Sequence, residues 1–376
     1  MTKSSNHIVV VGGGLAGVKV IKSLIQKFHC SGNISITLVE YQNEPLCNIA
    51  TPRALVDKSF ASSCYLSYDK LFRNFSNGKV IHGWVNEMSA TSLKVKTNDE
   101  LLDISFDYLI LATGCKVKTP WQHYTEFKDD GLLYLSQFPN TINESQSILL
   151  IGGGPTSIET AAEIKETYPQ KEVTIVSNGL LSRTDIDPSY IKKLRGKLER
   201  LGIVLLLGER IIKPKDFQTD ELLVHQHLKT KSGLEIYADL VLDSTGSIKP
   251  NTGFVEEFDP TSITESGYIQ VTNTLQLEAY KNIFSLGDVA NTGAPKMAAV
   301  LDPQVSTVTS NIYAMIHQKG LTEYVTPAND TMFLSVGKKD AFGCFKGYNN
   351  IVLDYAGIYL KSGDLFLGQL KPLYGL

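Results

Sequence analysis

Short apolar runs alternate along the chain with stretches of helical periodicity, and this alternation predicts parallel strands joined by helices. The pattern occurs twice, as strand, helix and strand. The predicted elements are Ile8–Val11, Leu15–Phe28 and Ser35–Val39 in the first copy, and Ser147–Ile151, Thr156–Tyr168 and Val173–Val176 in the second. The sequence therefore predicts an α/β protein with two comparable units.

The first strand runs into a glycine-rich loop with the spacing G-x-G-x-x-G. Gly12 makes the tight turn, Gly14 lets a pyrophosphate approach the backbone, and Gly17 lets the helix pack against the strand. The next strand ends at Glu40, where an acid can accept a hydrogen bond from an adenine ribose. A glycine-rich turn in another α/β domain is the alternative, but the context favours a dinucleotide site.

The second copy has a similar loop with two departures. Gly152 and Gly154 keep the first two glycines, whereas Ser157 takes the third position. The following strand ends in Ser177-Asn178 without an acid, and Arg183 lies a few residues further on. The absence of an acid permits either NADH or NADPH. Two such loops imply one tightly bound flavin dinucleotide and one exchanging nicotinamide dinucleotide.

Further strand ends carry small and polar residues, where ligands lie in open α/β folds. The strand Phe106–Ala112 leads to Thr113 and Gly114, a later buried strand leads to Gly246, and Ile283–Leu286 leads to Gly287 and Asp288. We expect these residues to contribute to the cofactor sites. Asp288 would hydrogen-bond a polyol chain such as the ribityl group of a flavin, although a turn or helix N-cap is its simpler role.

Three further residues are cofactor-binding candidates. Arg53, near a short predicted helix, is a candidate cation for cofactor phosphates, with a solvated surface arginine as the alternative. A long helix is predicted over Pro295–Lys319, and its start, with Lys296 and Met297, would bring backbone N–H groups near a flavin ring edge.

Composition narrows the class of protein. The 376 residues are 43% hydrophobic and 20% charged with a net charge of −3, as in a soluble globular protein, and no basic field points to nucleic acid. Histidine and cysteine spacing suggests no metal site. The cysteines also form no close pair along the sequence, so a reduced compartment fits; they are Cys30, Cys47, Cys64, Cys115 and Cys344.

Targeting signals are not expected either. We find no apolar run of transmembrane length, no signal peptide and no Gly at position 2 for myristoylation. The expectation is a cytoplasmic protein, with peripheral contact to a membrane or a lipid droplet as an option.

The ordered motifs GGGLAG, LILATG, GGGPTSIE, LDSTGSIKPN and IFSLGDVANTGAPKMA resemble those of flavoproteins with two dinucleotide-binding domains. The strings AAEIKETYPQKEVTIV, APKMA and YLKSGDLF are most similar to the branch of apoptosis-inducing factor and the ferroptosis suppressors. This resemblance implies noncovalent FAD, NADH or NADPH as donor and a quinone as small-molecule acceptor.

The resemblance also implies a domain plan. It has two Rossmann-like, doubly wound parallel-sheet domains, the second inserted in the first, and a short C-terminal α+β segment. The FAD-binding domain would span 1–118 and 251–325, the NAD(P)H-binding domain 119–250, and the C-terminal segment 326–376.

Two catalytic candidates follow from the same resemblance. Glu159 matches the position at which related proteins keep a glutamate between nicotinamide and flavin; from the residues alone it is a glutamate favourable to the helix dipole. Lys361 matches the terminal K-S-x-D-L-F pattern and could stabilise negative charge on a flavin or quinone oxygen, or simply be a solvated lysine.

Two alternative functions stay open. Cys47 lies near the position of the single redox cysteine of NADH peroxidases, although its loop differs, and a partly buried inert thiol is the other interpretation. A dithiol mechanism is disfavoured because the first domain lacks C-x-x-x-x-C and the tail lacks histidine. A redox-sensitive signalling or partner-binding protein with weak turnover is the second alternative.

The tail after residue 330 is expected to contain a strand at MFLSVG, a turn at Phe342-Gly343 and a strand or helix over Ile351–Lys361. The apolar end Leu365–Leu376 suits core packing, docking over the flavin pocket or contact with a membrane. The oligomeric state is left open.

Overall fold

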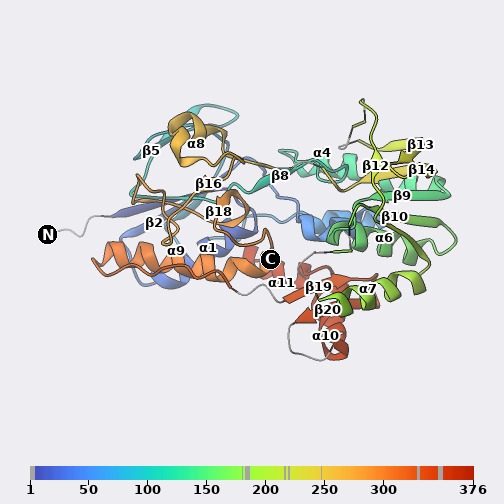
Figure 1. The fold of residues 1–376 in the computed structure, drawn as a ribbon. Coiled ribbons are helices and arrows are strands. Elements are labelled where there is room, and N and C mark those ends of the chain that lie inside the picture. Colours follow the sequence, from blue (N-terminus) through green and yellow to red (C-terminus); the bar gives the residue numbers. More distant parts are fainter. Residues whose placement is uncertain are drawn as a thin grey trace.

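The computed structural model describes residues 5–376 except 180, 183–186, 216, 219–220, 247, 328–330 and 346–349. Two α/β units lie side by side, and the C-terminal segment lies beneath the second one (Figure 1). This arrangement confirms the predicted fold class. Arg183 lies outside the described residues.

The first unit is built on a parallel sheet of five strands in the order β17-β7-β1-β2-β3. Its strands are β1 (Asn6–Val11), β2 (Ile34–Glu40), β3 (Gly78–His82), β7 (Tyr108–Leu111) and β17 (Ile283–Ser285). Helix α1 (Leu15–Phe28) has the predicted bounds, because Val18, Ile21 and Leu24 recur at helical spacing and bury one face. It packs beside helix α9 (Leu301–Ile316).

The second unit is built on a sheet of six strands in the order β11-β10-β9-β14-β13-β12. Its strands are β9 (Ser147–Ile151), β10 (Glu172–Ser177), β11 (Ile203–Leu207), β12 (Ile211–Ile212), β13 (Leu223–Thr230) and β14 (Glu235–Asp243). The first three and β14 run parallel, while β13 is antiparallel to both of its neighbours. Helices α6 (Pro155–Thr167) and α7 (Pro188–Arg200) follow β9 and β10.

Smaller elements complete the two units. The strands are β4 (Trp84–Met88), β5 (Ser92–Lys96), β6 (Leu101–Ser105), β16 (Ile269–Gln270) and β18 (Ala290–Asn291). The helices are α2 (Thr51–Ala54), α3 (Lys58–Ala61), α4 (Lys128–Leu135), α5 (Gln137–Glu144) and α8 (Gly253–Phe258), with short 3-10 turns at 48–50, 62–64, 260–262, 287–289 and 298–300.

Two antiparallel connections carry the chain between the units. Strand β8 (Cys115–Val117) leaves the first unit and pairs with β15 (Ile248–Pro250), which returns to it. A Cβ atom on Gly246 would lie 1.4 Å from the carbonyl oxygen of Lys118, so only glycine allows the two connections to pass this closely. This backbone approach explains why residue 246 is a glycine, and the contribution of Gly246 to a cofactor site stays a prediction.

Helix α9 begins later than predicted. The expected helix at Pro295 is replaced by extended backbone at Met297, a 3-10 turn at Ala298–Val300 and then α9. Pro303 lacks an N–H and is tolerated in the first turn of a helix but not in its interior, which fits a start at Leu301. At the other end, Gln318 has a positive φ of 53°, which stops the helix before Lys319.

The C-terminal segment also differs from the prediction. Strand β19 (Thr331–Ser335) is present as expected, but Phe342 and Gly343 lie inside strand β20 (Ala341–Phe345) and not in a turn. A Cβ atom on Gly343 would lie 2.5 Å from the carbonyl oxygen of Leu353, so this glycine serves close packing. The following residues form helix α10 (Asn350–Gly357) and a π-helical turn at Ile358–Ser362.

The last helix, α11 (Leu367–Tyr374), packs onto the first unit. Leu367, Leu370 and Tyr374 are buried. The hydroxyl of Tyr374 donates to the carbonyl oxygen of Gly13 at 3.2 Å, and that of Tyr68 donates to the same oxygen at 2.9 Å. Core packing is thus the role that the structure gives to this part of the tail. No helix in the described ranges is long and apolar enough to cross a membrane.

We predict that Tyr374→Ala destabilises the protein by about 3–5 kcal/mol, because it removes a buried ring and leaves a cavity beside the first glycine loop. Tyr374→Phe keeps the ring and should cost less than about 1.5 kcal/mol, since Tyr68 still donates to Gly13. Urea unfolding of both variants measures the difference. A small and equal loss in both would contradict the packing role.

Candidate functional site

The first glycine loop has the geometry of a phosphate cradle. Gly12 has a φ of +101°, and a Cβ atom there would lie 2.4 Å from the carbonyl oxygen of Ala112. A Cβ atom on Gly17 would lie 1.9 Å from the carbonyl oxygen of Gly12, whereas one on Gly14 would meet nothing within 4 Å. Packing therefore requires the outer two glycines, while at Gly14 the glycine leaves room for a ligand to approach the backbone.

Helix α1 begins at this loop without a side-chain cap. Its N-cap is Gly14, so no side chain satisfies the first free N–H groups of the helix. Free N–H groups and the positive end of the helix dipole together bind phosphate. The residues present thus fit the pyrophosphate of a dinucleotide.

Glu40 lies at the end of β2, next to the same loop. Its Oε2 accepts from the Gly13 N–H at 2.6 Å, and its Oε1 accepts from the Gln42 N–H at 3.0 Å. Burial raises the pKa of its carboxyl, and these N–H groups act in the opposite direction. Glu40, the residue predicted to bind the adenine ribose, is therefore held beside the loop by hydrogen bonds from backbone N–H groups.

The strand ends of the first unit lie at the same edge of the sheet. Thr113 donates its hydroxyl to the carbonyl oxygen of Asn251 at 2.7 Å, and the Asn251 N–H donates to the carbonyl oxygen of Gly114 at 3.0 Å. These contacts fasten the end of β7 to the returning connection. Gly287 donates its N–H to Gln304 on α9 at 2.8 Å, which positions the turn that carries Asp288.

Asp288 and Lys296 influence one another across this edge. Desolvation by the surrounding protein raises the pKa of Asp288, and the Lys296 cation opposes that shift. The Lys296 ammonium donates to the carbonyl oxygen of Ala290 at 2.5 Å and lies 4.5 Å from the ring centroid of Tyr268. Met297, partly buried, follows in extended backbone. The predicted flavin contacts Asp288, Lys296 and Met297 are thus neighbours in the structure.

The second glycine loop repeats the first. Gly152 has a φ of +112°, and a Cβ atom on Gly154 would meet nothing within 4 Å. Helix α6 starts here with Pro155 and no side-chain cap. The buried Ser157 hydroxyl, at the position of the third glycine, hydrogen-bonds the hydroxyl of Ser244 at the end of β14. A small polar residue is accommodated because the neighbouring strand end supplies its partner.

A cavity of 780 Å³ opens over this loop. It is lined by Ile151, Gly152, Gly153, Gly154, Val176, Ser177, Asn178, Gly179, Ser182, Glu209, Arg210, Ile211, Ile212, Lys213, Lys231, Ser244 and Thr245. The volume is in the range of cofactor sites, and the loop backbone forms one of its walls. The residues present fit a second dinucleotide.

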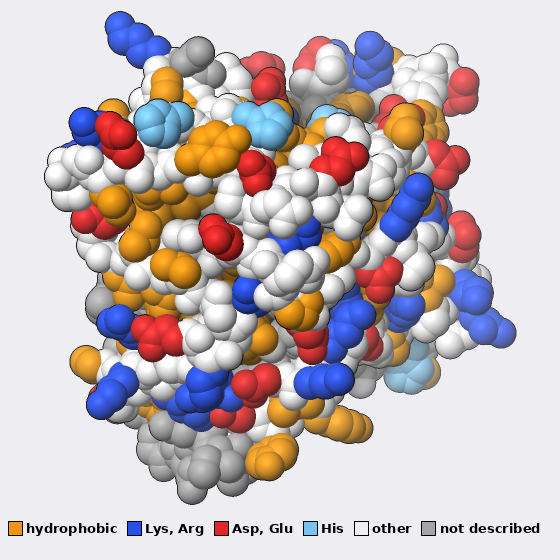
Figure 2. Space-filling model, turned by 90° about the vertical axis from the view of Figure 1, so that its right-hand side faces the viewer, with side chains coloured by type: hydrophobic (Ala, Val, Ile, Leu, Met, Phe, Trp, Pro, Cys, Tyr) orange, Lys and Arg blue, Asp and Glu red, His pale blue; other side chains and the backbone are white. Residues whose placement is uncertain are grey.

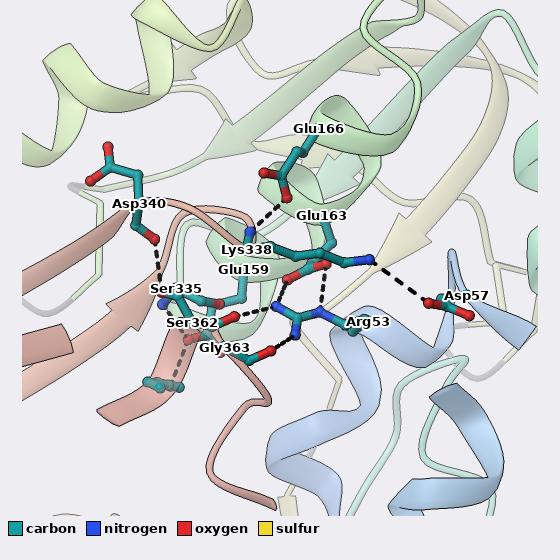
Figure 3. A network of polar contacts seen from close by, with 11 residues as sticks. Arg53, Asp57, Glu159, Glu163, Glu166, Ser335, Lys338, Asp340, Ser362 and Gly363 are labelled. Atoms are coloured by element: carbon teal, nitrogen blue, oxygen red, sulfur yellow. Dashed lines mark hydrogen bonds and ion pairs between the residues drawn. The ribbon is translucent and has the colours of Figure 1, made fainter. Parts of the chain in front are cut away.

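Helix α6 carries three glutamates at i, i+4 and i+7 that face the rest of the molecule (Figure 3). The first, Glu159, forms an ion pair of 2.5 Å with Lys361, and its Oε1 also accepts from the Ser335 N–H at 3.0 Å. Lys361 also donates to the carbonyl oxygen of Phe333 at 3.1 Å and is only 7% exposed. The structure therefore joins the two catalytic candidates in one buried pair, and Lys361 is not a solvated surface lysine.

The second glutamate, Glu163, binds Arg53 through both carboxyl oxygens, at 3.0 and 2.7 Å. The guanidinium also donates to the carbonyl oxygens of Ser362 and Gly363, each at 2.6 Å (Figure 3). Burial raises the pKa of Glu163, and Arg53 acts in the opposite direction. Arg53 is thus neither the expected phosphate ligand nor a surface residue, because its guanidinium is buried and bound to Glu163, Ser362 and Gly363.

The third glutamate, Glu166, accepts from the Lys338 N–H at 2.6 Å. The Lys338 ammonium in turn lies 3.8 Å from Asp57 of the first unit. Sequence reasoning missed both Glu163 and Glu166. The spacing of the three acids on one predicted helix face was a signal that could have indicated them.

Cys47 is buried, with 8% of its surface exposed, and desolvation raises its pKa to about 11. Cys64 lies nearby, and the Cys47 N–H donates to its carbonyl oxygen at 2.7 Å. Redox cysteines are thiolates at neutral pH, so this environment favours the inert thiol.

We predict that Arg53→Met destabilises the protein by about 3–5 kcal/mol at pH 8, because Glu163 stays buried without its partner. The loss should shrink at pH 5. Burial holds the pKa of Glu163 above its unfolded value, so the folded carboxyl takes up a proton in acid and its penalty grows as pH rises through the folded pKa.

Urea unfolding at the two pH values measures both effects. The matched control is the double variant Arg53→Met with Glu163→Leu, which should recover most of the stability at pH 8 because no charge stays buried. An equal loss at both pH values, or no recovery in the double variant, would contradict the buried pair.

We also predict that iodoacetamide at pH 8 modifies Cys30 and spares Cys47. Cys30 is exposed, whereas a pKa of about 11 leaves roughly one part in a thousand of Cys47 as thiolate at that pH. Peptide mass spectrometry after timed labelling provides the measurement, with Cys30 as internal control. Labelling of Cys47 as fast as Cys30 would restore the redox interpretation.

Comparison with known proteins agrees with this geometry. Over residues 6–314 the chain matches the family described as pyridine nucleotide-disulphide oxidoreductase. It is 30% identical to human ferroptosis suppressor protein 1 over 372 residues, covering 96% of this chain and 94% of that protein. It is also 30% identical to apoptosis-inducing factor homolog B of Dictyostelium discoideum over 305 residues, covering 77% and 76%.

Among solved structures, the sulfide:quinone oxidoreductase of Aquifex aeolicus has the same fold. The TM-score is 0.74 at 17% identity, covering 98% of this chain and 92% of that one. These matches confirm the resemblance inferred from the motifs. The chain is a member of the pyridine nucleotide-disulphide oxidoreductase family and, with its two dinucleotide-binding units, an NAD(P)H-dependent oxidoreductase.

Proposed function

We propose that this protein is an FAD-dependent oxidoreductase that takes hydride from NADH or NADPH and passes electrons to a quinone-type acceptor. One observation carries the proposal: two glycine loops, each opening an uncapped helix, lie at strand ends of two sheets in one chain. A flavin dinucleotide at the first loop would supply the two-electron chemistry between nicotinamide and quinone.

The chain's own residues bind and orient the two dinucleotides. The first loop and Glu40 would hold the FAD pyrophosphate and adenine ribose, and Asp288 would accept from the ribityl chain. The second loop would hold the exchanging coenzyme, whose adenosine half fits the 780 Å³ cavity. No covalent nucleophile is required, since orientation and charge balance supply the catalysis.

Glu159 and Lys361 are the candidates for charge balance. Glu159 lies in the first turns of α6, close in sequence to the loop that would bind the coenzyme, and Lys361 is held against it from the C-terminal segment. A buried cation in a fixed position can stabilise negative charge that develops on a nearby ring oxygen. The pair would thus act at the reacting rings without itself being consumed.

A quinone acceptor is supported by the likeness in fold to the sulfide:quinone oxidoreductase, which extends over the C-terminal segment as well. Contact with a membrane that holds quinone is a further part of the proposal. Because α11 is packed on the first unit, that contact would use other exposed residues of the tail, such as Tyr355 and Tyr359, which are 71% and 88% exposed. The burial of Cys47 disfavours the peroxidase alternative.

The proposal is tested by anaerobic stopped-flow reduction of the purified protein with NADH and NADPH, followed by mixing with a short-chain ubiquinone. We expect rapid bleaching of the flavin absorbance and rapid reoxidation. Rapid bleaching with slow reoxidation would rule out the quinone acceptor. A protein that does not bleach would favour the signalling or partner-binding alternative.

We predict that Lys361→Met slows flavin reduction or reoxidation roughly 10²-fold. The control is Lys339→Met, an exposed lysine of the same segment, which should react like the wild type. Lys361→Arg keeps the positive charge and should restore part of the rate, which a purely structural role in stability would not require. Unchanged rates in a folded Lys361→Met protein would contradict this role.

A further inference from the structure

The second site lacks an acid where NADH-binding proteins hold the adenine ribose. Strand β10 ends in Ser177, which is followed by the exposed Asn178, and both line the cavity. An acid at this position accepts from the ribose 2′-hydroxyl and repels a 2′-phosphate. Its absence leaves the 2′ position open to either coenzyme, so the surrounding side chains decide.

Backbone hydrogen bonds bring two more segments to this strand end. The Glu209 N–H donates to the carbonyl oxygen of Ser177 at 3.0 Å, and the Lys231 N–H donates to the carbonyl oxygen of Arg210 at 2.9 Å. The turn after β11 and the turn between β13 and β14 are thereby fixed beside β10. This places Arg210 and Lys231 on the same wall of the cavity as Ser177.

The positively charged side chains of this wall differ in whether a carboxylate already pairs with them. Lys213 is occupied, because it forms an ion pair with Asp243 and donates to the Thr245 hydroxyl at 2.8 Å. Arg210 and Lys231 are exposed, and no carboxylate of the described residues pairs with either side chain. Arg210 and Lys231 thus line the cavity as two cations without a carboxylate partner among the described residues.

One acid also lines the cavity. Both oxygens of Glu209 accept from the Ser232 hydroxyl at 2.8 Å. Glu209 is therefore already hydrogen-bonded, and among the described lining residues two cations without a carboxylate partner, Arg210 and Lys231, stand against this single acid. On the face of the molecule shown in Figure 2, acidic and basic side chains are interspersed.

We propose that the second site is built for NADPH, with the 2′-phosphate bound by Arg210 and Lys231 next to Asn178. The proposal rests on the function given above, because it assumes that the second loop binds a nicotinamide dinucleotide. A phosphate monoester carries close to two negative charges at neutral pH, and Arg can bind it through two parallel hydrogen bonds. NADH carries an uncharged hydroxyl at the 2′ position, so it offers Arg210 and Lys231 no partner of this charge there.

A binding experiment tests the site without relying on electron transfer. Isothermal titration calorimetry of the full-length protein compares adenosine 2′,5′-bisphosphate with adenosine 5′-monophosphate at low salt. We expect the bisphosphate to bind at least about tenfold more tightly. Arg210→Ala and Lys231→Ala should each remove most of this difference and leave the affinity for the monophosphate nearly unchanged.

The matched control is Lys229→Ala. Lys229 is an exposed lysine of β13 that does not line the cavity and lies 4.0 Å from Glu235, so its loss should change neither affinity. Equal affinities for the two nucleotides in the wild type would overturn the proposal. A bisphosphate preference that survives both Arg210→Ala and Lys231→Ala would overturn it as well.

Stopped-flow reduction separates this proposal from the function on which it rests. We expect NADPH to reduce the flavin at a lower half-saturating concentration than NADH, and Arg210→Ala to raise that concentration for NADPH alone. Reduction that favours NADH would overturn the NADPH site and leave the oxidoreductase function intact. Tight binding of the bisphosphate with no bleaching by either coenzyme would support the site and contradict the oxidoreductase function.

Discussion

The buried ion pair between Arg53 and Glu163 is the constraint on which the arrangement of the molecule depends. Arg53 comes from the first unit, Glu163 from the second, and the carbonyl oxygens of Ser362 and Gly363 from the C-terminal segment. Removing two charges from water is costly, and the cost is offset only when the geometry satisfies both groups. A single guanidinium with three sets of acceptors therefore fixes the relative position of three parts of the chain.

Helix α6 carries Glu163 of this ion pair and begins at the second glycine loop. Its N-terminus at Gly154 has no side-chain cap, and its side carries Glu159, Glu163 and Glu166 toward partners in the other parts. The helix is a rigid element, so the second glycine loop and the buried contacts are held at a set spacing. Lys361 is brought to the same helix, which places a cation from the end of the chain beside a residue near the second loop.

The two glycine loops share one backbone geometry. Both have a glycine at positive φ and a second glycine with free space above it. They differ at the end of the next strand, where the first unit has the buried Glu40 and the second has Ser177 followed by Asn178. Because the loops are nearly equivalent, the two sites differ mainly in the side chains at the strand ends and on the neighbouring turns.

The fold class, most strands and helices, and the two glycine loops could be predicted from the sequence, because hydrophobic periodicity and glycine spacing are local properties of the chain. The prediction misplaced the start of α9, which Pro303 restricts, and the turn at Phe342-Gly343, where Gly343 packs against Leu353. Three other features became visible only in the folded chain: Arg53 pairs with Glu163, Gly246 lies against Lys118, and Arg210 and Lys231 share a cavity with Ser177. These are contacts between residues distant in sequence, and a partner that lies far along the chain leaves no local pattern by which to recognise it.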